Sequence, residues 1–420
     1  MKEILLIHHR LPFPLNNGMD KLRFNLITIL AKHYRVTLAA PINRNTKQEW
    51  IEKVKSCGIE LFTVQIPINA EWLIKFKGFF ILRWLYLIFS STPKYSSENF
   101  YGAFNIALLN LIGSKNFYFI QILSDFSGCY LKYLRGNNFI ITGPMDDTIE
   151  MAQKSILFAK TIPQKLGRIF LYNSIRKYFS EICRMSDLVM FHSEKDLKSV
   201  KSNLDFDFEA IILPIPPEQI EKAEEPSDEI EPDSLVFVGG FGAIFNQDAA
   251  EHLVRDILPL IKRKTPNVIL YLVGDNPPGT ILNYQADKNI IVTGFVDDVK
   301  TYIRKSAVFV SAVRIGTGIK TKTIEALSMS KAMVVSSASL QGLWETDSSI
   351  FICDENNEFA EKVISILSDP ILRKKQEKRS AELFNRAYSF SYVSNLMINI
   401  YSNIQIRKTV DMALIRKGPR

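Results

Sequence analysis

The sequence predicts an α/β protein with two doubly wound domains, and three observations support this prediction. The chain has 420 residues, which exceeds the usual size of a single domain. Residues 3–40 read as a buried strand, an amphipathic helix and a second strand, the opening of a doubly wound parallel sheet. After an acidic stretch that contains prolines, a new alternation of strands and helices begins at Ser234. We therefore predict domains at residues 1–213 and 214–387, followed by a terminal segment at residues 388–420.

The carboxyl end of the first strand is a candidate ligand site, because ligands bind at that edge of doubly wound sheets. The strand Glu3–His8 is followed by a loop that reaches Gly18, where the backbone either approaches a ligand closely or makes an ordinary turn. His8 and His9 stand at the same strand end. A histidine in this position is more often a hydrogen-bonded structural residue than a catalytic one, so neither is assigned a role.

The segment Trp72–Phe89 is rich in aromatic and aliphatic residues but is interrupted by Lys75, Lys77 and Arg83. Its longest uncharged run, Trp84–Pro93, is about half of the roughly 20 residues that a membrane-spanning helix needs, so no such helix is predicted. Two readings remain open. The segment either packs on the first sheet as a helix or lies in a membrane interface, with its lysines on anionic lipid.

The rest of the first domain continues the alternation and ends in a charged linker. Asp146 and Asp147 follow a strand that begins at Phe139, and they either reach the ligand crevice or, in the case of Asp147, cap the next helix. Residues 218–233 carry eight acids against one lysine, which predicts an exposed linker. The other expected elements are helix Glu49–Gly58, strand Ile59–Ile66, helix Glu98–Ile112, strand Asn116–Leu123, helix Thr148–Ala159, helix Lys165–Met185, strand Leu188–His192 and a helix capped by Ser193.

The second domain repeats the pattern, beginning with a buried strand that runs into the pair Gly239 and Gly240. Its expected elements are strand Ser234–Val238, helix Asp248–Arg263, strand Val268–Val273, strand Ile290–Thr293, helix Val299–Ser306, strand Ala307–Val313, strand Ala332–Ser336, strand Ile350–Cys353, helix Glu358–Ser368 and helix Pro370–Ala387.

A loop with two glycines and three cations lies between the strand Ala307–Val313 and the helical pattern that follows it. Gly316 and Gly318 let the backbone approach a bulky anion, and the first helical turn points its free N–H groups at the same place. Arg314, Lys320 and Lys322 would oppose the helix dipole unless an anion lay between them. We interpret the loop as a diphosphate cradle. The alternative is an ordinary turn whose cations are solvated.

Glu325 lies too far into that helix to be its N-cap, and a carboxylate beside bound phosphates is suited to accepting hydrogen bonds from ribose hydroxyls. The pattern Gly-x-Gly-Ile-Lys-x-Lys-x-x-Glu-Ala-Leu over residues 316–327, with the Val-Val-Ser and Gly-Leu that follow, resembles the nucleotide-sugar-binding motif of retaining glycosyltransferases of family four. The resemblance implies the GT-B fold, in which two Rossmann-like domains face each other across a cleft. It assigns acceptor binding to residues 1–213, nucleotide-sugar binding to residues 214–387 and a helix that crosses back to the first domain to residues 388–420.

The resemblance also implies a function. The chain would be a hexosyltransferase-type enzyme that moves a sugar from a nucleoside diphosphate sugar to a hydroxyl of a glycan or glycolipid, with retention of anomeric configuration. Its role would be in the biosynthesis of a cell-surface polysaccharide or glycoconjugate. No cofactor and no metal are implied, because Arg314, Lys320 and Lys322 would stabilise the leaving diphosphate.

Individual donor residues follow from the resemblance. The loop at Gly294 and Phe295 would pair its backbone with the nucleobase. The family commonly has an Arg and a Lys after the glycine pair, but this chain has Phe241 there, so Asn246 and the backbone of Gly239 and Gly240 remain as contacts.

Two further positions depart from the family pattern. Thr317 stands where the first of two glutamates is expected, so sugar recognition would fall to Thr317 or to the backbone of Gly316 and Gly318, with Ile319 completing the loop. Asp125 matches a catalytic or acceptor-orienting position, without the histidine that often accompanies it.

Composition limits the function classes. With 52 Lys and Arg against 44 Asp and Glu, the net charge is +8, which favours anionic partners such as a nucleoside diphosphate or an acidic lipid surface. Nucleic acid is not expected, because no zinc spacing and no helix-turn-helix signal are present. The four cysteines and five histidines show no zinc-ligand spacing, so no metal site is predicted.

The N-terminus has no signal-peptide features, and the scattered cysteines indicate a reducing compartment. We therefore expect a cytoplasmic protein, either free or at the inner face of the membrane. Contact with anionic lipid would involve residues 72–89 and the basic tail Arg407–Arg420, which is otherwise expected to be disordered. Two other functions stay open: a nucleotide-sugar 2-epimerase of the same fold, and a membrane-associated scaffold without turnover.

Overall fold

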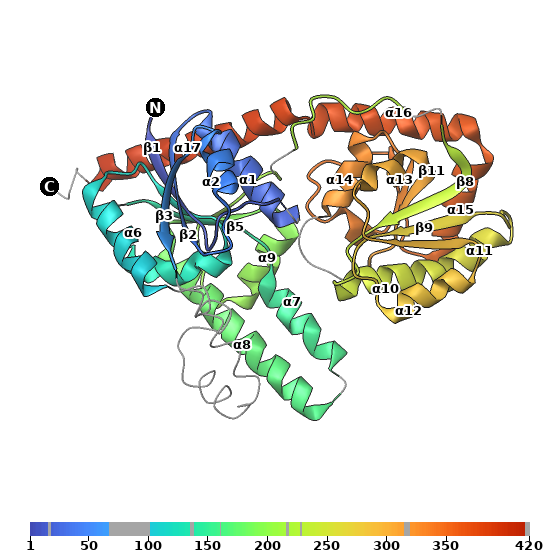
Figure 1. Ribbon diagram of the computed structural model, residues 1–420, viewed down its shortest axis with the longest axis horizontal. Coiled ribbons are helices and arrows are strands. Elements are labelled where there is room, and N and C mark those ends of the chain that lie inside the picture. The colour runs from blue at the N-terminus through green and yellow to red at the C-terminus, as the bar shows by residue number, and fades with distance from the viewer. Residues whose placement is uncertain are drawn as a thin grey trace. The chain divides into compact units, whose positions relative to one another are not determined.

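The computed structural model describes residues 1–15, 18–66, 101–134, 138–159, 161–215, 218–226, 229–314 and 320–415. The chain divides into two compact units, which are Met1–Pro216 with Leu396–Arg420 (unit 1) and Pro217–Asn395 (unit 2). Each unit is a parallel sheet with helices on both faces (Figure 1). The segment Trp72–Phe89 lies outside the described residues.

Unit 1 contains a seven-stranded sheet in the order β3-β2-β1-β4-β5-β6-β7, within the described residues. The strands are β1 (Glu3–Ile7), β2 (Arg35–Ile42), β3 (Glu60–Gln65), β4 (Ile120–Ile122), β5 (Ile140–Met145), β6 (Leu188–Phe191) and β7 (Ala210–Ile212). The helices are α1 (Gly18–Ala31), α2 (Gln48–Lys55), α6 (Gly102–Ser114), α7 (Thr148–Ser155), α8 (Ile162–Met185) and α9 (Glu194–Asn203), with 3-10 helices at Asp125–Tyr133 and Ile156–Phe158. The sequence predicts every strand except β7, which pairs in parallel with β6 and extends the sheet by one strand.

Unit 2 contains a six-stranded sheet in the order β10-β9-β8-β11-β12-β13, again within the described residues. The strands are β8 (Glu231–Val238), β9 (Ile269–Val273), β10 (Ile290–Gly294), β11 (Ser306–Ser311), β12 (Met333–Val335) and β13 (Ile350–Ile352). The helices are α10 (Ile244–His252), α11 (Leu258–Lys262), α12 (Gly279–Leu282), α13 (Val299–Lys305), α14 (Thr321–Ser328), α15 (Asn356–Ser368), α16 (Pro370–Ala387) and α17 (Phe390–Ile415), the last of which continues into unit 1.

The central strands β1 and β11 each contain a continuous buried apolar run because helices cover both faces of each sheet. In β1, the side chains from Ile4 to Ile7 are fully buried, and in β11 those from Ala307 to Val310 are buried in the same way. Both sheets reverse their strand order between the two central strands, at β1 and β4 in unit 1 and at β8 and β11 in unit 2. Such a reversal leaves a crevice at the carboxyl ends of the two strands, where ligands of this architecture bind.

The terminal helix α17 is anchored in the core of unit 1 by Tyr401. Its hydroxyl donates to Oε1 of Gln121 at 2.9 Å, and its ring stacks on Phe119 with the centroids 5.9 Å apart. The helix extends to Ile415, so the expectation of disorder is wrong for residues 407–415 of the basic tail, and residues 416–420 lie outside the described residues.

The helix that follows the glycine pair of unit 2 differs from its prediction. It was expected over Asp248–Arg263, but it begins at Ile244, and a wider π-helical turn at Leu253–Ile257 separates α10 from α11. Pro259 lies just beyond this turn and has no N–H to donate to a carbonyl one turn back. The wider turn accommodates the missing hydrogen bond without ending the helix.

The acidic stretch before β8 is not the free linker that its composition predicts. Oγ of Ser330 donates to the carbonyl of Glu224, and the Glu224 N–H donates to the carbonyl of Ser328 at 2.7 Å. Ala223 is buried, and its N–H donates to Oδ1 of Asn385 at 2.7 Å. Residues 218–226 therefore pack on unit 2.

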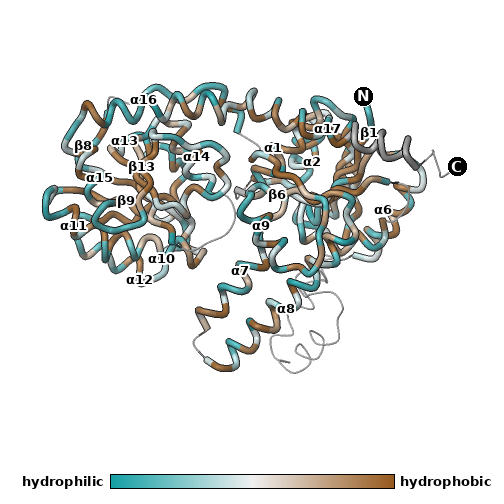
Figure 2. Tube along the Cα trace, turned by 180° about the vertical axis from the view of Figure 1, so that it is seen from behind, coloured by the Kyte–Doolittle hydropathy of each residue, from teal (hydrophilic) through white to brown (hydrophobic). Residues whose placement is uncertain are grey.

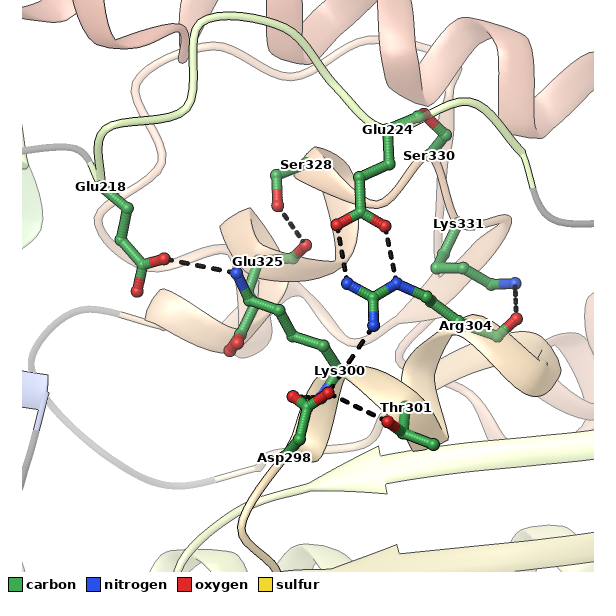
Figure 3. Close-up of polar contacts among 10 residues, drawn as sticks. All are labelled: Glu218, Glu224, Asp298, Lys300, Thr301, Arg304, Glu325, Ser328, Ser330 and Lys331. Carbon is green, nitrogen blue, oxygen red and sulfur yellow. Dashed lines mark hydrogen bonds and ion pairs between the residues drawn. The ribbon is translucent and has the colours of Figure 1, made fainter.

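Cations of α13 explain why this acidic stretch packs (Figure 3). Nε and Nη2 of Arg304 contact the two carboxylate oxygens of Glu224 at 2.8 and 2.9 Å, a bidentate ion pair. Nζ of Lys300 lies 3.6 Å from a carboxylate oxygen of Glu218. Like charges along a chain repel unless cations face them, and α13 supplies those cations.

The Arg304–Glu224 pair leads to a prediction about stability. We expect Glu224→Ala to lower the free energy of unfolding by about 1 kcal/mol, a modest value because the two side chains are 41% and 39% exposed and solvent screens the pair. Glu225→Ala is the matched control, since that carboxylate is 82% exposed and pairs with the exposed side chain of Lys222. Equal destabilisation by the two variants in urea unfolding would show that the Arg304 contact contributes nothing.

The pH dependence of this effect has a definite sign. The hydrogen bonds from Arg304 hold the pKa of Glu224 below its ordinary value of 4.5. A carboxyl with a lowered folded-state pKa contributes stability above its unfolded pKa and loses it as the pH falls through the folded one. The difference between wild type and Glu224→Ala should therefore be constant from neutral pH to about pH 5 and should disappear in stronger acid.

Candidate functional site

The predicted donor residues of unit 2 follow strands at the carboxyl edge of its sheet. Gly239 comes directly after β8 and Arg314 follows β11, and these two strands are neighbours at the reversal of strand order. Gly294 ends β10 at the same edge, since all the strands are parallel. The sheet topology thus places all three at the edge of the sheet that this architecture uses for ligands, with Gly239 and Arg314 at the crevice between β8 and β11.

The glycine loop after β8 is held against the loop after β9. A Cβ atom on Gly239 would lie 2.8 Å from Cγ of Asn246, and one on Gly240 would lie 2.8 Å from Oδ1 of Asp275. One on Gly274 would lie 2.0 Å from the Gly239 carbonyl oxygen, which no side chain allows. Nδ2 of Asn246 donates to the carbonyl of Gly240 at 2.8 Å. Asn246 therefore fixes the shape of the loop.

Arg314 is oriented by a carboxylate that was not among the predicted site residues. Its Nε contacts Oδ2 of Asp248 at 3.1 Å and its Nη2 contacts Oδ1 at 2.6 Å. These hydrogen bonds raise the pKa of Arg314 above its ordinary value. The side chain is 49% exposed, and a guanidinium has five N–H groups, so this fork leaves three for a ligand.

Lys320 contacts the same helix as Arg314. It occupies the N-cap position of α14, its N–H donates to the carbonyl of Gln341 at 3.0 Å, and its Nζ lies 5.1 Å from the ring centroid of Phe245. Phe245 and Asp248 lie three residues apart in α10, which places their side chains on one face of that helix. The structure therefore brings Arg314 and Lys320 together over α10.

Lys322 and Glu325, which were predicted to hold different parts of the donor, form an ion pair with each other. Nζ of Lys322 lies 2.6 Å from Oε2 of Glu325, one turn further along α14. The carboxylate is the more buried partner, with 16% of its side chain exposed against 41% for the lysine. The carbonyl of Glu325 accepts from Oγ of Ser328 at 2.7 Å (Figure 3). In this state, each side chain neutralises the other.

The remaining predicted donor positions fall into two groups. Gly316, Thr317, Gly318 and Ile319 lie outside the described residues. Gly294 has φ of 68°, a conformation that favours glycine, at a register shift of β10. Phe295 follows with 75% of its surface exposed.

A cavity of about 230 Å³ opens beside Arg314, at the carboxyl ends of β11, β12 and β13. His252, Ser336, Ser337, Cys353 and Asp354 contribute to its lining. Among the predicted site residues that the structure describes, only Arg314 lines it. The cavity therefore adjoins the predicted donor site without coinciding with it.

Asp125 of unit 1 lies at the reversal of strand order between β1 and β4. Its carbonyl accepts from the hydroxyl of Tyr178 at 2.6 Å, and its Oδ2 accepts from Oγ1 of Thr148 at 3.4 Å. Nδ1 of His9 lies 3.1 Å from Oγ of the preceding residue, Ser124. A histidine from the end of β1 therefore lies beside the Asp125 segment. Gly18, the other predicted residue here, opens α1.

Arg23 is a charged residue of this region that the sequence does not single out. It is 9% exposed, and its Nε has no hydrogen-bond partner among the described residues. Burial lowers its pKa, and the charges of Asp125, Asp146 and Asp20 oppose that shift. A cation in an amphipathic helix pattern is ordinarily solvated, so only the structure identifies Arg23 as the buried cation that faces Asp125.

Burial favours the neutral form of three histidines of unit 1, His8, His9 and His192, because it lowers their pKa values. Burial, with smaller contributions from the charges of Arg23 and Arg10, lowers the pKa of His9 to about 3, and burial lowers that of His192 to about 4.

Asp147 caps α7, since its Oδ1 accepts from the N–H of Glu150 at 2.8 Å. Within the described parts of the chain, no group of three or more His, Cys, Asp and Glu side chains is placed to hold a metal ion.

Comparisons with known proteins relate these features to a family. Residues 232–369 match the family model described as glycosyl transferases group 1. A sequence search of curated proteins finds no match. None of the described helices has the length and apolarity needed to cross a membrane.

Solved structures resemble the chain over nearly its whole length. Sucrose-phosphate synthase from Thermosynechococcus elongatus is 15% identical, with 96% of this chain and 99% of that one covered and a TM-score of 0.63. TarM is 11% identical, with coverage of 96% and 99% and a TM-score of 0.67. HepE from Anabaena, in complex with UDP and glucose, is 12% identical, with coverage of 95% and 99% and a TM-score of 0.62.

The predicted fold class is confirmed by two parallel-sheet units and by the similarity to these structures. The matched segment 232–369 contains the glycine loop, Arg314, Lys320 and the Lys322–Glu325 pair. The chain therefore has the GT-B fold, and its residues 232–369 are similar to the glycosyl transferases group 1 family.

Proposed function

We propose that the chain is a glycosyltransferase that moves a sugar from a nucleoside diphosphate sugar to a hydroxyl of a glycan or glycolipid, with retention of anomeric configuration. The observation that carries the proposal is the convergence of Arg314 and Lys320 on α10, beside the glycine loop, within the matched family segment. Two cations and a glycine loop at the reversal of strand order suit a diphosphate. The cellular role would be synthesis of a surface polysaccharide or glycoconjugate.

The chemistry that these residues support is stabilisation of the leaving group. When the bond between the anomeric carbon and the diphosphate breaks, negative charge develops on the phosphate oxygen. Arg314 is already oriented by Asp248, so its remaining N–H groups need little rearrangement to bind that charge. Lys320 stands at the start of α14, where the helix dipole adds positive potential. These cations perform the task that a metal performs in other transferases, and the proposal therefore includes metal independence.

The Lys322–Glu325 pair has a role in donor binding. A diphosphate competes with Glu325 for the ammonium group of Lys322, because it carries more negative charge. Once Lys322 turns to the phosphate, the Glu325 carboxylate can accept hydrogen bonds from ribose hydroxyls. The Lys322–Glu325 pair thus joins two side chains that would contact different parts of the donor.

On the acceptor side, Asp125 would orient the acceptor hydroxyl, with neutral His9 beside it. The leaving phosphate oxygen would take the acceptor proton in a front-face reaction. HepE, which has a similar fold, is complexed with UDP and glucose, and this supports uridine as the base of the donor. A glycolipid acceptor would bring the enzyme to the inner face of the cytoplasmic membrane.

The donor class is tested by thermal shift of the purified chain with UDP, GDP, ADP, dTDP and CMP. We expect UDP to raise the Tm by several degrees, in line with about 2.7 kcal/mol of stabilisation at a ligand concentration of 100 Kd. The shift should persist in EDTA, because side-chain cations bind the diphosphate. No shift with any nucleotide would overturn the donor-site assignment and favour a scaffold without turnover.

The separate roles of Lys322 and Glu325 are tested with UDP and inorganic diphosphate, which lacks ribose. We expect Lys322→Ala to weaken binding of both ligands by about tenfold, the loss of one charge-assisted hydrogen bond. Glu325→Ala should weaken UDP binding but leave diphosphate binding unchanged or stronger, since Lys322 loses its competing partner.

Lys374→Ala serves as the control in these titrations, because Lys374 is an exposed lysine on α16. If Glu325→Ala weakened both ligands equally, Glu325 would be acting through the structure of α14 and its ribose role would be wrong.

If Asp125 orients the acceptor, its substitution should lower kcat and leave the KM for the donor unchanged. We expect Asp125→Asn to lower kcat by roughly 100-fold while the donor KM and the Tm shift with UDP stay at wild-type values. Activity is measured as UDP release from UDP sugars in the presence of glycan or lipid acceptors. Loss of the UDP shift in this variant would instead indicate that Asp125 supports the fold.

A further inference from the structure

A cluster of exposed apolar side chains on α7 and α8 has no function in the proposed reaction. Leu157 and Ile162 are the most exposed of the cluster, at 82% and 77%. Single exposed apolar residues are common on protein surfaces, but a contiguous group marks an interaction site. The group consists of six large apolar residues within 21 positions: Met151, Leu157, Ile162, Leu166, Ile169 and Leu171.

Four of these six residues, Leu157, Ile162, Leu166 and Ile169, lie at the free end of a helical hairpin. In Figure 1, α7 and α8 run side by side and project from the sheet of unit 1, and Figure 2 shows apolar segments on both helices. Leu157 and Ile162 flank the turn between the helices. We call residues 154–159 and 161–169 the hairpin tip. Within α8, Ile162, Leu166 and Ile169 follow the i, i+4, i+7 spacing and form one stripe.

The two halves of α8 use their apolar residues differently. In the half near Met185, Ile175, Phe179 and Ile182 are buried in the core of unit 1. The half near the turn has apolar side chains of similar kind, but they face solvent. Packing within unit 1 therefore accounts for one half of the helix only.

The charge around the stripe is strongly positive. Residues 148–185 contain seven Lys and Arg against two Glu. At the tip, Lys165 is exposed between Ile162 and Leu166, and Arg168 donates to the carbonyl of Ser155. An apolar stripe flanked by cations fits an anionic lipid surface, where acyl chains receive the apolar groups and headgroups neutralise the cations.

We propose that the hairpin tip inserts its apolar side chains into the headgroup region of an anionic lipid bilayer. A second copy of this chain is a poorer occupant, because a two-fold contact through the tip would bring two strongly positive hairpins together. Within α7 and α8 the backbone hydrogen bonds are made along each helix, and at the depth of the headgroups water and polar headgroups remain available to the backbone groups at the helix ends. The proposal concerns residues other than 72–89 and does not depend on the transferase activity.

The test is co-sedimentation of the full chain with vesicles of phosphatidylcholine and phosphatidylglycerol, and with vesicles of phosphatidylcholine alone. The wild-type chain should bind the anionic vesicles and bind more weakly as salt is raised. The triple variant Leu157→Ser, Ile162→Ser, Leu166→Ser should lose about tenfold or more in partitioning. Lys165→Glu should weaken binding to anionic vesicles only.

Ile106→Ser, which removes a 63% exposed side chain from α6, is the control and should bind as wild type does. The far-UV circular dichroism and the Tm of every variant should match the wild type, since the changed side chains are exposed. Hydrogen exchange with vesicles present should slow in the hairpin tip. The proposal is overturned if the triple variant binds like wild type, if both vesicle types bind equally, or if the triple variant abolishes a dimer seen in light scattering without vesicles.

Discussion

Parallel pairing of the strands is the constraint on which the rest of this structure depends. Because β8, β9, β10 and β11 all run in one direction, their carboxyl ends share an edge, and every loop that follows them begins there. The reversal of strand order between β8 and β11 sends the following helices to opposite faces and leaves a crevice between them. The glycine loop and Arg314 lie at that edge because each of them follows the carboxyl end of a strand, β8 and β11 respectively.

Electrostatics then determines how the charged residues at this edge are held. Arg314 pairs with Asp248, and Lys322 pairs with Glu325. Pairing reduces the mutual repulsion of cations that a bare diphosphate site would suffer. It also sets their orientation before a ligand arrives, which is the condition for effective electrostatic catalysis. An ion pair also acts far from the site, where Arg304 of α13 holds the acidic stretch through Glu224.

The two units place their polar groups in different environments. In unit 1, the buried Arg23 faces several carboxylates, and the neighbouring histidines are held neutral by burial. In unit 2, the predicted donor cations remain about half exposed and accessible. A buried, rigid group of charges suits the orientation of a hydroxyl, whereas accessible cations suit exchange of a highly charged donor and product. The exposed hairpin of unit 1 adds a third kind of surface, apolar and basic together.

The sequence by itself determined the features that depend on near neighbours along the chain. Continuous apolar runs predicted the buried parallel strands β1 and β11, the helix caps at Asp147 and Ser193 were readable from residue type, and the glycine and lysine spacing indicated the family. These features are local, so a few residues carry the whole signal.

Only the tertiary structure decided which distant side chains meet. Arg314 contacts a carboxylate 66 residues away, Arg304 contacts one 80 residues away, and Tyr401 reaches Gln121 across 280 residues. The composition of the acidic stretch before β8 predicted an exposed linker. The sequence does not show that α13 places cations against this stretch, so the prediction was wrong. The burial of Arg23 could not be predicted for the same reason, because it depends on contacts with residues distant in the sequence. A side chain's partners and its solvation depend on how whole elements pack, and that packing is a sum over the entire chain.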